Sequence, residues 1–212
     1  MYLPPQFNNL NILHTIELIR EYPLASLITN GEDGFPFITH LPLHVEEEGA
    51  SFILWGHVAK PNPHWKYLMN NYSSVVSFMG PQSYMSPKVY PDLVRVPTWT
   101  YLTVQCTVKA DIIDSNEEKD TLLKKLIGQH EPDYAKQWRS LGKDYTEKML
   151  SGIVGFKLNV EKYLCKLKLN QHRPESHQAM YDLYENGNDN ERALATWMRK
   201  LGMVSSRDQM QP

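Results

Sequence analysis

The amino-acid sequence predicts a mainly β protein with added helices, an α+β fold built around a small antiparallel barrel. Apolar and polar residues alternate over several short runs, as expected for strands with one buried face. Helical patterns form separate segments and do not alternate regularly with strands, which argues against βαβ units. The sequence contains no GxGxxG motif and no P-loop motif, so a Rossmann or P-loop nucleotide fold is not expected.

The elements follow from the local patterns. Helices are expected at 11–21, 63–70, 115–150 (in several pieces), 176–185 and 189–201. Strands are expected at 24–29, 35–45, 52–57, 74–79, 99–108, 152–160 and 163–169. The first three strands should form a meander, and the proline-rich segment 80–97 is expected to be irregular.

Composition limits the class of protein. Of the 212 residues, 42% are hydrophobic and 11% are aromatic, which is typical of a globular protein with a core. The net charge of −2 provides no overall basic field for nucleic acid or an anionic membrane. No apolar run approaches the ~20 residues that cross a bilayer, and no secretory signal begins the chain. We therefore expect a cytoplasmic protein with no membrane association, forming a single domain over 1–212.

The spacing of the cysteines, histidines and serines does not indicate a metal site or a catalytic nucleophile. Cys106 and Cys165 are far apart in alternating apolar runs, so buried thiols are expected rather than a zinc or redox pair. The eight histidines form no HExxH motif, and no GxSxG elbow is present. No metal ligand and no catalytic residue is assigned.

The strand 35–45 has two prolines on one face. Pro36 and Pro42 remove hydrogen-bond donors from a sheet ladder, so this strand is expected at an edge or at a bulge. An edge strand leaves backbone groups that can face a ligand. The turn before it, Asn30–Gly34, is rich in residues that tolerate positive φ.

The stretch Phe52–Asn71 organises the candidate site. An apolar strand breaks at Gly56, passes His57 and Lys60, and enters a helix at Asn62-Pro63, a favoured N-cap and first helical position. Exposed N–H groups and the positive end of the helix dipole attract anions, so we expect a cofactor phosphate here. The alternative is an ordinary strand–turn–helix connection with a surface lysine.

Polar and aromatic residues bracket the predicted barrel. This mixture suits a flat aromatic cofactor with a phosphate tail, although each aromatic residue taken singly is more often a core residue. The residues are Thr39, His40, His57, Lys60, Asn62, Gln82, Ser83, Tyr84, Trp99 and Tyr101.

Six motifs in fixed order carry a family resemblance: MYLPPQF, TNGEDGFPFITHLPL, GHVAKPNPHW, GPQSYMSP followed by VPTWTY, GIVGF and KLNQHRP. The chain resembles the PaiB-type FMN-binding negative transcriptional regulators, which are pyridoxamine-phosphate-oxidase-like split barrels. The resemblance implies a six-stranded antiparallel split β-barrel, with a helical insertion at about 115–150 and C-terminal helices at about 176–202. It also implies FMN at a homodimer interface and repression of genes for sporulation or secreted degradative enzymes.

The same motifs extend the cofactor-binding set to Leu41, Gln171 and Arg173; Arg173 could instead be a surface residue at a strand end. The chain departs from the family pattern at four positions that bear on FMN affinity. Lys60 replaces an arginine, Val89 an aromatic residue, and Thr100 and His172 replace asparagines. Lysine keeps the charge but lacks the bidentate fork of arginine.

Three functions stay open at this level. The first is a flavin-binding homodimeric regulator that acts on DNA directly or through another protein. The second is a flavin-dependent oxidoreductase or a haem-degrading oxygenase, and the third is an FMN-binding oligomer without chemistry of its own. A basic helix that reads DNA is not evident, since acidic residues interrupt the lysines of 119–139. The regulator role therefore depends on the resemblance.

Overall fold

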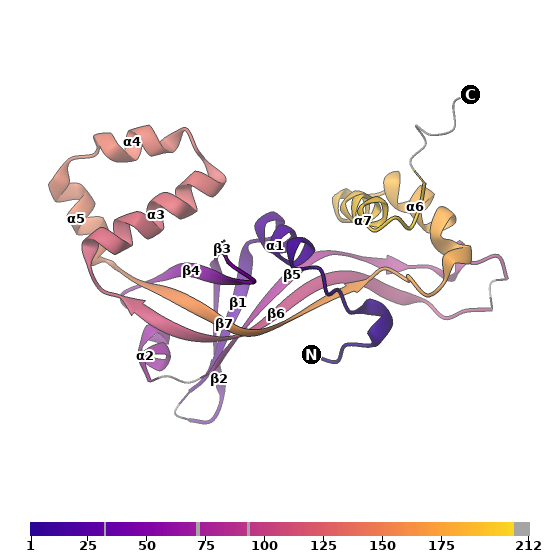
Figure 1. Ribbon diagram of the computed structural model, residues 1–212, viewed down its shortest axis with the longest axis horizontal. Coiled ribbons are helices and arrows are strands. Elements are labelled where there is room, and N and C mark those ends of the chain that lie inside the picture. Colours follow the sequence, from indigo (N-terminus) through magenta and orange to yellow (C-terminus); the bar gives the residue numbers. More distant parts are fainter. Residues whose placement is uncertain (32, 71–72, 93, 206–212) are drawn as a thin grey trace. The chain divides into compact units, whose positions relative to one another are not determined.

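The computed structural model describes residues 1–31, 33–70, 73–92 and 94–205 (Figure 1). The chain divides into two compact units. The central unit comprises Ile12–Phe78 and Val104–Tyr163, and the terminal unit comprises Met1–Asn11, Met79–Thr103 and the segment from Leu164 onward. The prediction of one domain over 1–212 stays a prediction. Three predicted segments each include a residue outside the described ranges: residue 32 in the turn Asn30–Gly34, residue 71 in the stretch Phe52–Asn71, and residue 93 in the irregular segment 80–97.

Strands and helices together confirm the α+β class. The strands form an antiparallel sheet in the order β2-β1-β5-β6-β7-β4-β3. Their bounds are β1 Leu24–Asn30, β2 Pro36–Pro42, β3 His44–Glu48, β4 Ser51–Ala59, β5 Ser74–Met85, β6 Thr98–Ile113 and β7 Ile153–Lys168. The helices are α1 Ile12–Glu21, α2 His64–Met69, α3 Asn116–His130, α4 Tyr134–Ser140, α5 Lys143–Ser151, α6 His177–Glu185 and α7 Asp189–Lys200. Short 3-10 turns are η1 Pro5–Phe7, η2 Pro87–Val89 and η3 Pro174–Ser176.

The predicted strand 35–45 is two strands, and the strands predicted at 152–160 and 163–169 are one, so the described sheet has seven strands. The family resemblance implied six. Pro42 has no N–H, and the N–H of Leu43 donates to the carbonyl of Pro23 at 3.0 Å, which interrupts the ladder between β2 and β3. The predicted meander is therefore wrong. β2 pairs with β1, whereas β4 pairs with β3 and β7. The edge position expected for the proline-bearing strand is confirmed, because β2 stands at one end of the sheet order.

Gly56 does not break its strand. β4 continues to Ala59, and His57 lies opposite Gly155 of β7. A Cβ atom at Gly56 would lie 2.4 Å from Leu43 Cδ2 and 3.0 Å from Phe156 Cε2. The glycine is therefore needed for close packing inside the central unit, a role that its local sequence does not distinguish from a turn.

Two other strand boundaries were also wrong. β7 is one strand of 16 residues, where two were expected, because its exposed pair Glu161 and Lys162 resembles a turn in the sequence. β5 runs to Met85, beyond the expected end at residue 79. Ser83 and Met85 are buried and Tyr84 is exposed, so strand alternation persists past Pro81.

The core of the central unit comes from the inward faces of its strands, as the alternation predicts. The buried side chains include Leu27, Phe52, Leu54, Val76, Phe78, Val104, Cys106, Phe156 and Leu158. Helix α1 adds Ile16, Leu18 and Ile19 from its apolar face. Cys106 here and Cys165 in the terminal unit are both buried, as expected.

Helices α3 and α7 begin and end at local capping residues. Ser115 caps α3, its hydroxyl accepting from the N–H of Glu118 at 3.2 Å. Asn188 and Glu191 form a full capping box at α7. Gly202, at φ 66°, ends α7 with hydrogen bonds from Gly202 N to Arg199 O and from Met203 N to Met198 O. No helix in the part of the chain described here is long and apolar enough to cross a membrane.

Candidate functional site

The connection between β4 and α2 is held in a defined shape. The N–H of Lys60 donates to Gly152 O at 2.8 Å, and the indole N–H of Trp65 donates to Lys60 O at 3.1 Å. Asn62 N donates to Ala59 O at 2.8 Å. These backbone contacts fix where the Lys60 side chain leaves the chain, while its ammonium group remains exposed.

Asn62 acts as the cap that the sequence predicts, although α2 itself begins at His64. Its Oδ1 accepts from the N–H of His64 at 3.0 Å, and its Nδ2 donates to Thr39 Oγ1 at 3.2 Å. Pro63 has no N–H, and the N–H of Lys66 donates to Pro63 O. The start of this six-residue helix therefore offers fewer free N–H groups than expected, and an anion here would be attracted mainly by Lys60.

His64 lies at the centre of a buried network and was missed at the level of sequence. Its Nδ1 lies 2.8 Å from Thr39 Oγ1 and its Nε2 lies 2.9 Å from Thr29 Oγ1; Thr29 Oγ1 lies 2.6 Å from Ser74 Oγ. Burial lowers the pKa of His64 to about 4, so the ring is neutral at pH 7. The network joins α2 to β2, β1 and β5, and so positions the Lys60 connection against the edge strand. The only sequence signal was the histidine following the Asn-Pro cap.

The predicted site residues of β2, Thr39, His40 and Leu41, differ in their exposure to solvent. His40 is exposed, and its Nδ1 lies 3.0 Å from Ser26 Oγ. Leu41 is buried in the core, so only its backbone can meet a ligand on this unit. The hydroxyl of Thr39 is already engaged by His64 and Asn62. Of the predicted β2 side chains, His40 is thus the exposed one.

His57 and Lys60 carry the features that a ligand would use. Burial lowers the pKa of His57, and its Nδ1 is a buried atom for which no hydrogen-bond partner is found among the described residues. No ion pair of Lys60 is found in the described ranges. Lys60 lines a cavity of about 360 Å³ with Trp65, Met69, Ile112, Asp114, Lys119, Ile153 and Val154. That volume lies within the range of small-molecule sites, roughly 300–1,000 Å³.

In the terminal unit, four predicted residues come together. The indole N–H of Trp99 donates to Gln82 Oε1 at 2.9 Å, and the rings of Trp99 and Tyr84 meet edge to face at 6.3 Å. Ser83 Oγ donates to Glu191 Oε1 at 2.9 Å. These side chains line an open cleft of about 490 Å³ with 188–191 at the start of α7.

Tyr101, Gln171 and Arg173 occupy other parts of the terminal unit. Tyr101 lies under the ammonium groups of Lys166 and Lys168, at 5.2 and 5.6 Å. Lys166 is only 7% exposed, because Tyr2 near the N-terminus covers it and accepts its hydrogen bond through the backbone carbonyl. Arg173 is exposed beside a second cavity.

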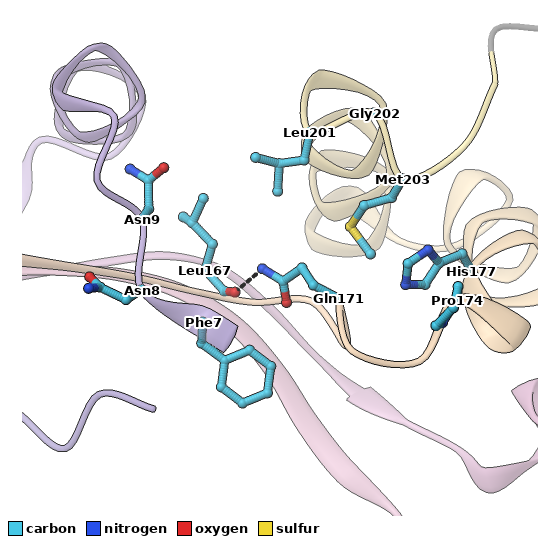
Figure 2. Close-up of a pocket in the computed structure, with 10 residues that line it drawn as sticks. All are labelled: Phe7, Asn8, Asn9, Leu167, Gln171, Pro174, His177, Leu201, Gly202 and Met203. Carbon is cyan, nitrogen blue, oxygen red and sulfur yellow. Dashed lines mark hydrogen bonds between the residues drawn. The ribbon is translucent and has the colours of Figure 1, made fainter. Parts of the chain in front are cut away.

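Gln171 faces a pocket of about 490 Å³ (Figure 2). Its Nε2 donates to Leu167 O and its Oε1 accepts from Leu169 N, which holds the side chain against β7. Figure 2 shows it between Leu167 and the ring of His177, with Met203 nearby. The two units therefore each hold part of the predicted set, and each part is defined within its own unit.

Comparison with known proteins identifies the family. Residues 1–162 match the family model described as "Putative FMN-binding domain". The chain belongs to this family. It is 33% identical over 178 residues to "Protease synthase and sporulation protein PAI 2" of Bacillus subtilis (strain 168), covering 83% of this chain and 84% of that protein. The resemblance to the PaiB-type family is confirmed.

A weaker sequence match and two matches to solved structures accompany the family assignment. An uncharacterised protein of Emericella nidulans is 25% identical over 250 residues, covering 98% of this chain and all of that protein. A conserved hypothetical protein from Mycobacterium tuberculosis superposes with a TM-score of 0.59 at 12% identity, covering 79% of this chain and 91% of that one. A FAD- and haem-binding protein from Mycobacterium smegmatis gives 0.58 at 16% identity, covering 76% and 73%. At these identities the structures show a shared fold only.

Proposed function

We propose that this protein is an FMN-binding homodimeric negative regulator of transcription, built on a split β-barrel with the flavin at the subunit interface. The observation that carries the proposal is the similarity to PAI 2 along 83% of the chain, together with the family match. The name of that relative directs the regulatory role toward protease synthesis and sporulation genes. Regulation of those genes would take place in the cytoplasm.

Lys60 is the residue we assign to the flavin phosphate. Its ammonium group is exposed, its backbone is fixed by Gly152 and Trp65, and it borders a cavity whose lining is mostly apolar but includes Asp114 and Lys119. A lysine held in this way attracts a phosphate as a point charge. FMN, when bound, supplies the redox-active ring. The unmatched Nδ1 of His57 offers a further polar contact.

The edge of the sheet supports a homodimer. Leu24, Phe35 and Ile38 are 65%, 73% and 51% exposed, and all three lie on the β1–β2 hairpin of the central unit. An edge strand with apolar side chains on its surface favours association with another chain. We therefore place the second subunit against this hairpin, where it would also cover the exposed His40.

We do not assign the surface for DNA to helix α3. Lys124 pairs with Asp120, Lys125 pairs with Glu46, and Lys119 is buried. Cations that are paired within the protein contribute little to phosphate contacts. We propose that any DNA contact is made outside α3 or through a partner protein.

The cofactor assignment is tested by Lys60→Ala, with Lys109→Ala as the control, since Lys109 is also exposed but pairs with Glu161. We expect Lys60→Ala to weaken FMN binding about tenfold or more, as the loss of a charge-assisted hydrogen bond predicts. Riboflavin, which lacks the phosphate, should bind both variants equally. Fluorescence titration measures both affinities, and unchanged FMN affinity in Lys60→Ala would remove the assignment.

The regulator role needs its own experiment. We expect native mass spectrometry to show a dimer with bound flavin. Deletion of the gene should raise transcript levels of secreted-protease or sporulation genes, and the wild-type gene should restore repression. A protein that leaves all such transcripts unchanged, and whose flavin is bleached by reduced nicotinamide with turnover in air, would be an oxidoreductase instead.

A further inference from the structure

A small cavity in the terminal unit is lined by basic side chains. Its volume is about 240 Å³, and its walls include Arg95, Lys168, His172 and Arg173 together with the hydroxyl-bearing residues Thr98 and Thr100. No acidic side chain is among the residues that line it. We call it the basic cavity. The cationic side chains come from the loop before β6, the end of β7 and the turn that follows it.

Arg95 has donors left over. Its Nη1 donates to Val94 O at 2.9 Å, and its Nη2 forms an exposed ion pair with Asp92 at 3.2 Å. Its Nε is buried and has no hydrogen-bond partner among the described residues. A buried N–H of a charged group without an acceptor is costly, so this position calls for an acceptor that the chain itself does not provide.

Lys168 also has a donor for which the described residues show no acceptor. Its ammonium group donates to Thr98 Oγ1 and to Trp99 O, both at 2.7 Å, which accounts for two of its three N–H groups. Partial burial lowers the pKa of Lys168; Lys166 acts in the same direction, and Tyr101 opposes them. An anion near the ammonium group would favour its charged form.

The turn that carries His172 and Arg173 is held by a buried network. Asn170 takes the left-handed conformation at φ 66°, accepts from the hydroxyl of Tyr90 at 3.2 Å and donates to Ser176 Oγ at 2.8 Å. His177 Nε2 lies 3.1 Å from Asn170 O. The ring of His172 meets Phe7 edge to face at 5.4 Å. The turn that forms one side of the basic cavity is thus held by contacts within the protein, and such preorganisation lowers the entropic cost of binding.

We propose that the basic cavity binds the phosphate or carboxylate group of a small molecule, with Arg95 and Lys168 as its main donors and Arg173 at the exposed side. The unmatched Nε of Arg95 and the third N–H of Lys168 point to an oxyanion, which can accept several hydrogen bonds at once. The volume limits the bound group to a small one. Arg173 also belongs to the cofactor-binding set that the family resemblance implies, but Arg95 and Lys168 do not, so the assignment is tested at two residues to which the flavin proposal gives no role.

The test is isothermal titration of the full-length protein with sodium phosphate and, separately, sodium acetate, at an ionic strength held constant with sodium chloride. We expect one saturable site per chain for at least one of these anions. Arg95→Gln and Lys168→Gln should each weaken that binding about tenfold or more. Arg20→Gln is the matched control, since Arg20 also holds an exposed ion pair, with Glu47, and should bind as the wild type does.

The anion that binds more tightly identifies the ligand as phosphate-bearing or carboxylate-bearing. Thermal melting shows which variants are folded, and two independent substitutions keep the test decisive if one of them does not fold. The assignment is overturned if neither anion shows saturable binding. It is also overturned if the folded Arg95→Gln or Lys168→Gln protein binds the anion as tightly as Arg20→Gln.

Discussion

The histidine network of the central unit and the asparagine network of the terminal unit both hold a turn that carries an exposed cation. In the central unit, His64 contacts Thr29 and Thr39 and fixes the connection that bears Lys60. In the terminal unit, Asn170 contacts Tyr90 and Ser176 and fixes the turn that bears Arg173. The residue types are similar, but the two networks place different demands on the chain.

The two networks differ in the constraint that each places on its central residue: a charge state for His64 and a backbone conformation for Asn170. His64 must stay neutral, because the buried groups around it are hydroxyls and not carboxylates. Asn170 must take a left-handed backbone conformation, which a side chain with a Cβ adopts at a cost. The first network should therefore respond to pH, whereas the second should respond to the backbone freedom of the substituted residue.

The largest effect is expected from His64→Ala. The substitution leaves the hydroxyls of Thr29 and Thr39 without their ring partner and opens a cavity at a fully buried position. The free energy of unfolding should fall by about 3 to 4 kcal/mol. Urea denaturation measures it. His130→Ala, at the exposed end of α3, is the control and should change stability by less than about 0.5 kcal/mol. Equal stability of the two variants would contradict the role given to the network.

The next effect is a loss of stability in acid. The pKa of His64 is about 4 in the folded protein against 6.5 for an ordinary histidine, so between these values the unfolded chain binds more protons. The free energy of unfolding contributed by this residue is constant above pH 6.5 and falls as the pH is lowered, by about 3 kcal/mol at pH 4. Burial of His57 acts in the same direction.

Urea denaturation at pH 7.5 and pH 4.5 measures this acid sensitivity. His64→Gln, which does not titrate, should lose less stability between the two pH values than the wild type, by about 2 kcal/mol. Carboxylates elsewhere affect both proteins alike and cancel. The same pH slope in both proteins would show that His64 is not the group responsible.

The smallest effect separates two substitutions of Asn170. Both Asn170→Gly and Asn170→Ala lose the hydrogen bonds to Tyr90 and Ser176, but alanine also bears the strain of the positive φ. We expect losses of about 1.5 kcal/mol for glycine and about 2.5 kcal/mol for alanine. Chemical denaturation of the pair gives the difference directly. If glycine costs as much as alanine, the left-handed conformation contributes nothing to the cost.

Several elements could be predicted because their signals are local. Ser115 and Asn188 cap helices through residues three positions away, and Gly202 ends α7 within one turn. The prolines of β2 predicted an edge strand from the missing donors alone. For the same reason Asn62 could be predicted as the cap near Lys60.

Other features could not be predicted because they depend on distant partners. Gly56 is a packing glycine only because Leu43 and Phe156 approach it. Lys166 is buried beneath Tyr2, a residue 164 positions away in the chain. The basic cavity collects residues from positions 95, 168 and 173, which no local pattern connects.

The sequence by itself determined the α+β class, most helices, the alternating faces of the strands and the family to which the chain belongs. These depend on residues within a few positions of one another, or on motifs read in order. Only the tertiary structure decided how the strands pair, which polar side chains are buried, and which cations stand beside a cavity. Pairing and burial bring together groups that are far apart along the chain, and the free energy of a buried polar group depends on those neighbours rather than on its own sequence context.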